Sequence, residues 1–106
     1  EGIDGRVYVA WGRMESRLGN LARARQVFAE GLKVEPDNTR IVHAWAVEEM
    51  REENVEDSRQ LLEYGIEVAP NDGILYQSFS LLEQKVGNIP KARELLEAGV
   101  AADPTN

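Results

Sequence analysis

The stretch 19-GNLARARQVFAEGLKVEPDN-38 is written twice more along the chain. A looser copy, ENVEDSRQLLEYGIEVAPND, occupies residues 53–72, and a third, GNIPKARELLEAGVAADPTN, occupies residues 87–106. Each copy begins 34 residues after the previous one, and no insertion breaks the spacing. Repetition at this period predicts a solenoid, in which stacked units bury a continuous core.

Each unit is predicted to contain two amphipathic helices. In the first unit Tyr8, Trp11, Glu15 and Leu18 follow the 3-4-3 spacing of one helical face. No segment alternates polar and apolar residues over a useful length, so we expect no strands. We expect the first helices of the units over residues 5–18, 39–52 and 73–86, and the second helices over 21–34, 55–68 and 89–102.

Residues that cap or end helices stand between these segments. We expect caps of the first helices from Asp4, Asn38 and Asp72. We expect caps of the second helices from Asn20, Asn54 and Asn88. Gly19 and Gly87 suit the left-handed residue that closes a first helix.

The pattern therefore predicts an all-α fold in one small domain. It is an α-solenoid of three 34-residue helix–turn–helix units and six helices, a segment of a right-handed superhelix. The units span about residues 5–38, 39–72 and 73–106, and we interpret the chain as a fragment of a longer array.

The order of small, aromatic, small and proline residues resembles a tetratricopeptide repeat, at Ala24, Phe28, Gly31 and Pro36. The W-x3-E pattern at 11–15 and 45–49, followed by "GN" and "AR", is similar to the HAT (half-a-TPR) variant. HAT arrays occur in RNA-processing assemblies, and this repeat sequence most resembles chloroplast proteins that bind and stabilise mRNA. This resemblance implies RNA processing in the chloroplast stroma, with the nucleus as the alternative.

Cations recur on the side of the first helices that faces away from Tyr8 and Trp11. They are Arg6, Arg13, Arg17, Arg40, Arg51 and Lys85. In tetratricopeptide-like stacks this side lines the concave groove, where a row of cations can follow the phosphates of single-stranded RNA. Three polar side chains beside the row can bond base edges, namely His43, Gln77 and Gln84.

The leading functional prediction is a non-catalytic domain that binds single-stranded RNA in this groove, for transcript processing or stabilisation. The alternative is a protein–protein scaffold within an RNA-processing complex, and a third reading is a structural spacer. Ile74 and Leu81 favour a protein partner, because they place apolar atoms on the face that carries the cations. We also expect weak self-association through the ends of the repeat array.

The remaining composition excludes several classes of site. The chain has no cysteine, one histidine and a formal net charge of -7, and it carries no catalytic or phosphate-binding motif. We therefore expect no enzyme, no metal site and no cofactor, and no run of apolar residues is long enough to cross a membrane.

Two charged features have structural interpretations. Glu15 and Arg25 recur at the same step in every unit, which predicts an ion pair that ties the first helix of a unit to its second. An acidic run at the end of one helix and the start of the next predicts solvated charge that the helix dipole favours, with a docking site for a basic partner as the alternative. Its members are Glu48, Glu49, Glu52, Glu53, Glu56 and Asp57.

Overall fold

The computed structural model describes residues 4–104. Within them six helices follow one another: α1 (Gly5–Arg17), α2 (Leu21–Val34), α3 (Thr39–Arg51), α4 (Val55–Val68), α5 (Gly73–Lys85) and α6 (Ile89–Ala102). This part of the chain contains no strand, so the fold is all-α. The predicted helices are confirmed, because every boundary lies within one residue of its expected position.

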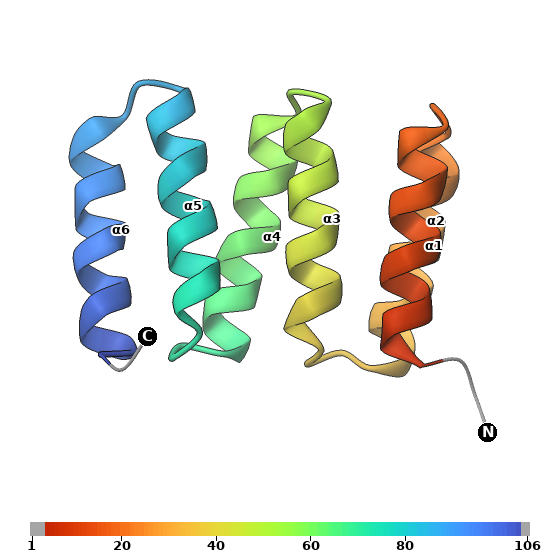
Figure 1. The fold of residues 1–106 in the computed structure, drawn as a ribbon, viewed down its shortest axis with the longest axis horizontal. Helices are drawn as coiled ribbons and strands as arrows, with labels where there is room; N and C mark the ends of the chain where they lie inside the picture. The colour runs from red at the N-terminus through yellow and green to blue at the C-terminus, as the bar shows by residue number, and fades with distance from the viewer. Residues whose placement is uncertain (1–3, 105–106) are drawn as a thin grey trace.

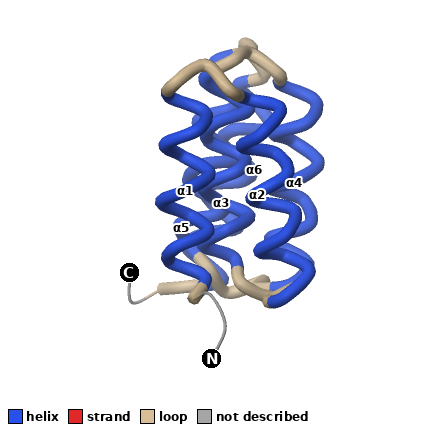
Figure 2. The backbone as a smooth tube through the Cα atoms, turned by 90° about the vertical axis from the view of Figure 1, so that its right-hand side faces the viewer, coloured by secondary structure: helices blue, strands red, loops and turns tan. Residues whose placement is uncertain are grey.

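The helices form two layers. They stand side by side along the long axis (Figure 1), in a slab of 39 × 29 × 18 Å. Seen from the end, α1, α3 and α5 lie to one side and α2, α4 and α6 to the other (Figure 2). This arrangement is a helical-repeat solenoid, and it leaves the outer side of the α1, α3 and α5 layer as one continuous surface.

Local capping fixes where the first helix of each unit begins. A side-chain oxygen accepts a hydrogen bond from the backbone N–H two residues later at Asp4 (2.8 Å), Asn38 (3.0 Å) and Asp72 (3.0 Å). The turn into the second helix needs a left-handed residue, which is Gly19 (φ 88°), Glu53 (φ 63°) and Gly87 (φ 85°). Both predictions are confirmed, and Glu53 adopts in the second unit the conformation that glycine takes in the others.

The predicted caps of the second helices are wrong. Asn20, Asn54 and Asn88 make no side-chain cap hydrogen bond. Each instead donates its side-chain amide to the glutamate five residues earlier, over 3.1 Å to Glu15, 2.9 Å to Glu49 and 3.5 Å to Glu83. The asparagines therefore hold a buried or half-buried carboxylate, which links the turn to the helix before it.

Apolar side chains from consecutive units meet between the two layers. Phe28 of α2 is fully buried and stacks on Trp45 of α3, with ring centroids 5.9 Å apart. At the same repeat positions Leu62 of α4 and Phe79 of α5 are buried in a second cluster. The core thus runs across unit boundaries, as expected of a solenoid.

Candidate functional site

The recurring glutamate and arginine form clamps between units. Arg25 of α2 donates two hydrogen bonds to Glu49 of α3, at 2.7 and 2.8 Å. Arg59 of α4 donates two to Glu83 of α5, at 2.9 and 3.1 Å. The predicted pairing within a unit is therefore wrong, because each arginine reaches forward to the next unit. We call these two bidentate pairs the inter-unit clamps.

The clamps are strong because several donors converge on a buried carboxylate. Burial alone would raise the pKa of Glu49, but hydrogen bonds from Arg25, Asn54 and Trp45 together hold it below its usual value. The bond from Arg59 likewise lowers the pKa of Glu83, against the opposing effect of burial. Both carboxylates are therefore charged under ordinary conditions.

These lowered pKa values predict that acid weakens the fold. In the unfolded chain these glutamates have pKa values of about 4.3, which are higher than their pKa values in the folded protein. As the pH falls toward 4.3, the unfolded state therefore binds more protons than the folded state. Stability that is present above pH 5 is then lost as pH falls through the lowered pKa values. We expect the difference in unfolding free energy between wild type and Glu49→Gln to shrink as urea titrations move from about pH 6 to pH 3. A difference that stays constant over this range would contradict the assignment.

Half of the basic row is paired with acid. Arg6 binds the cap carboxylate of Asp4 at 2.8 Å. Arg17 of α1 and Arg51 of α3 both pair with Glu48, at 3.1 and 3.4 Å. Within residues 4–104, the predicted cations that make no ion pair are Arg13, Arg40 and Lys85.

Glu48 corrects the interpretation of the acidic run. Its side chain is 0% exposed, and it also accepts a 2.9 Å hydrogen bond from Ser16 of α1. Neighbouring Glu49 is 2% exposed in its clamp. The first two acids of the run are thus structural groups inside the stack, and only later members such as Glu52 and Asp57 lie in solvent.

The three predicted base-reading residues have different surroundings. His43 of α3 is half-buried and contacts Ser78 of α5, with Nε2 and Oγ 2.6 Å apart. Burial lowers the pKa of His43, opposed by Asp72 and helped by Arg13. Gln77 instead lines a hollow beside α6, and exposed Gln84 donates to Ser80 on its own helix.

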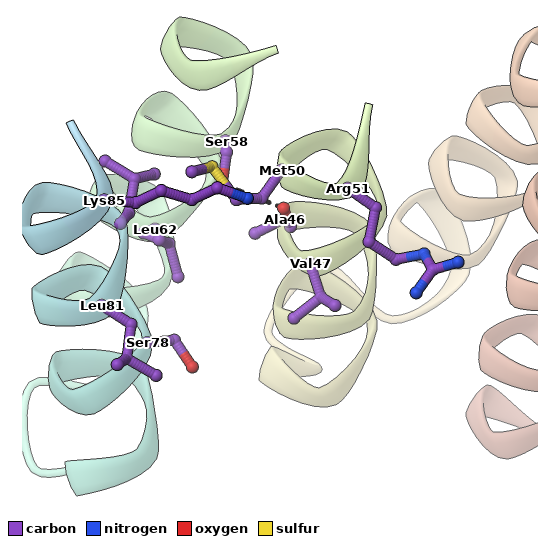
Figure 3. Close-up of a pocket in the computed structure, with 10 residues that line it drawn as sticks. Ala46, Val47, Met50, Arg51, Ser58, Leu62, Ser78, Leu81 and Lys85 are labelled. Carbon is purple, nitrogen blue, oxygen red and sulfur yellow. Dashed lines mark hydrogen bonds between the residues drawn. The ribbon is translucent and has the colours of Figure 1, made fainter. Parts of the chain in front are cut away.

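An apolar pocket opens between α3 and α5 (Figure 3). We call it the α3–α5 pocket; it holds about 230 Å³ and is lined mainly by Val47, Met50, Leu62, Leu81 and Leu82, with Lys85 at its edge. Lys85 extends from α5 toward Met50, whereas Arg51 leaves α3 on the side away from Leu81 and Ser78. Leu81 is 58% exposed, so its side chain is available to a ligand.

A hollow of about 230 Å³ also lies between α1 and α3, but Arg13, Arg40 and His43 form part of its lining. Sequence differences at equivalent positions explain why the α3–α5 pocket is more apolar. In the first unit Ser16 donates a hydrogen bond to the buried carboxylate of Glu48. One unit later, Ser16 is replaced by Met50 and Glu48 by Leu82, which leaves apolar walls.

Leu81 and Lys85 could be recognised from the sequence, but Met50 and Leu82 were not predicted. The change from an acidic residue at 48 to an apolar residue at 82, one repeat later, could have indicated an apolar site.

Residues 4–104 hold no group of three or more His, Asp or Glu side chains placed to bind a metal ion. None of the six helices combines the length and apolar character needed to span a bilayer.

The paired helices, two layers and inter-unit clamps define an α-solenoid built from repeated helix pairs. Residues 5–48 match the tetratricopeptide repeat family. Among solved structures, the chain is similar to MamA, residues 41 to the end, from Desulfovibrio magneticus RS-1, with a TM-score of 0.70 and 22% identity. The match covers 97% of this chain and 58% of that one, and at this identity the likeness concerns the fold. No curated protein matches the sequence.

Proposed function

We propose that this domain is a protein-interaction module that holds a segment of a partner protein in the α3–α5 pocket. Repeat domains of the tetratricopeptide type are typically non-catalytic and use their extended surfaces for binding. The observation that carries the proposal is an open apolar pocket on the α1, α3 and α5 layer, with an exposed leucine at its rim.

The size of the pocket supports a side chain as its occupant. Pockets for small molecules and cofactors enclose about 300–1,000 Å³, and the α3–α5 pocket is smaller and open to solvent. Such a space suits one large apolar anchor, the kind of residue that dominates protein interfaces. Lys85 makes no ion pair within residues 4–104, so a carboxylate beside the anchor would complete the contact.

The charges favour protein over RNA. A phosphate-tracking groove needs cations that are free to replace counterions. Arg17 and Arg51 instead flank the buried carboxylate of Glu48, and Arg6 binds Asp4. Binding of single-stranded RNA by the basic row stays a prediction from the positions of its cations and from the family resemblance, and the HAT subtype and the chloroplast setting stay predictions from the resemblance alone.

A peptide-display selection against residues 1–106 tests the proposal. We expect enriched peptides to share a large apolar residue next to Asp or Glu. Leu81→Asp should weaken their binding by about 10-fold or more, because it places a charge at the rim of an apolar contact. Val34→Asp is the matched control, since Val34 is equally exposed on α2, away from the pocket. Peptides that bind Leu81→Asp as tightly as wild type would overturn the proposal.

A salt titration with oligo-uridine tests the RNA alternative on the same protein. RNA binding predicts a steep loss of affinity with salt, and a shallower slope when Arg17, Arg51 and Lys85 are changed to glutamate. The protein proposal predicts no such binding at moderate salt. Salt-dependent RNA binding that the triple change removes, together with failure of the peptide selection, would favour the RNA reading.

A further inference from the structure

The two ends of the described stack carry unmatched halves of an inter-unit clamp. Arg25 and Arg59 each bind the glutamate of the following unit. Arg93 occupies the same step on α6, is exposed, and makes no ion pair within residues 4–104. Glu15 occupies the glutamate step on α1 and receives hydrogen bonds from Trp11 and Asn20, but none from an arginine.

The outer side of α6 also leaves apolar groups uncovered. Leu96 is 45% exposed, although its counterparts Phe28 and Leu62 are buried by the next unit. Val100 is exposed as well. Beside them Gly73, Gly99 and Gln77 help to line a hollow of about 350 Å³. The surface that receives the next unit elsewhere in the stack is therefore open at α6.

The outer side of α1 presents the side chains that would fill this surface. Ile41 and Leu75 are fully buried, and each lies against a glycine of the preceding unit, 3.0 Å from a Cβ built at Gly31 and 3.1 Å from one built at Gly65. Val7 holds the same step on α1 and is 49% exposed. Its matching glycine is Gly99, whose nearest neighbours all belong to Tyr76 of its own unit.

We propose that the α6 face of one copy binds the α1 face of a second copy and repeats the internal unit boundary. Val7 enters the hollow at Gly99, Trp11 packs on Leu96, and Arg93 forms a clamp with Glu15 of the neighbouring copy. The two faces differ, so the contact is head-to-tail and leaves a free face at each end. Association therefore continues beyond the dimer as concentration rises.

Charge reversal tests this contact with sedimentation velocity over a concentration series of residues 1–106. Wild type should show a weight-average mass that rises with concentration. Arg93→Glu and Glu15→Arg should each weaken association by about 10-fold or more, because like charges then face each other. The double variant should recover wild-type association, and so should an equimolar mixture of the two single variants.

Leu96→Asp provides a second test that leaves the charged pair in place. It should also abolish association, while thermal unfolding confirms that the variant is folded. Val34→Asp, with a similar exposed apolar residue on α2, should associate like wild type. A wild type that stays monomeric up to its solubility limit would overturn the proposal, as would charge-reversed variants that fail to restore association when combined.

Discussion

Glu49→Ala lowers the free energy of unfolding by about 2–3 kcal/mol, the upper part of the range for losing hydrogen bonds to a charged group, because the carboxylate is buried whereas the Arg25 side chain is 42% exposed and can return to solvent. The carboxylate is 2% exposed and accepts bonds from Arg25, Trp45 and Asn54. Alanine leaves all three donors without their acceptor and removes the ion pair between α2 and α3. Urea unfolding followed by circular dichroism measures the change.

Glu15→Ala is the matched control, because Glu15 holds the same step in the first unit. It accepts bonds from Trp11 and Asn20 but takes part in no ion pair within residues 4–104. Its loss should cost about 1 kcal/mol, the typical net value of a hydrogen bond. Equal costs at the two positions would show that the clamp to Arg25 adds nothing to the stability of the stack.

Phe28→Ala is expected to cost a further large amount, about 3–5 kcal/mol, as measured for buried aromatic residues in other cores. The ring is fully buried and stacks on Trp45 of the next unit. A Cβ built at Gly12 of α1 would lie 2.4 Å from it, so the ring fills the space between two units completely. Removing it opens a cavity at the centre of the first cluster.

The repeat supplies two comparisons for this substitution. Leu62→Ala removes the buried counterpart in α4 and should cost about 2–5 kcal/mol. Leu96→Ala removes the half-exposed counterpart in α6 and should cost less than about 1 kcal/mol, since surface changes have small effects. The three chemical-denaturation midpoints should rank in that order. A cost at Leu96 equal to that at Leu62 would mean that α6 is covered in solution.

The helices could be predicted from sequence because their signals are local. Capping residues such as Asp4 and Asn38 bond a backbone N–H only two residues away. The 34-residue period then gave the helix boundaries of each later unit from those of the first. The partner of Arg25 could not be predicted in this way, because Glu15 and Glu49 occupy equivalent positions of the repeat. Which of the two glutamates Arg25 binds depends on the direction in which its side chain leaves α2.

The candidate site was harder to predict because it depends on positions at which one unit differs in sequence from the others. Burial of Glu48 could have been inferred from its register with Leu82, but the run of acids around it suggested solvent exposure. The row of cations was visible in the sequence, whereas the pairing of Arg17 and Arg51 depends on the buried Glu48 of α3. Pockets and paired charges arise between units, where sequence spacing alone gives no distances.

Because each clamp joins one unit to the next, the clamps affect how a repeat array can gain or lose units during evolution. Arg25 and Arg59 each clamp the glutamate of the unit ahead, so both described boundaries use the same two residue types in the same order, although Arg59 also bonds Glu56 of its own helix. Deleting or duplicating a block of 34 residues joins a new arginine to a new glutamate, and no bonding group is orphaned. The array can therefore grow or shrink by whole units in one genetic step, and its binding surface lengthens or shortens with it.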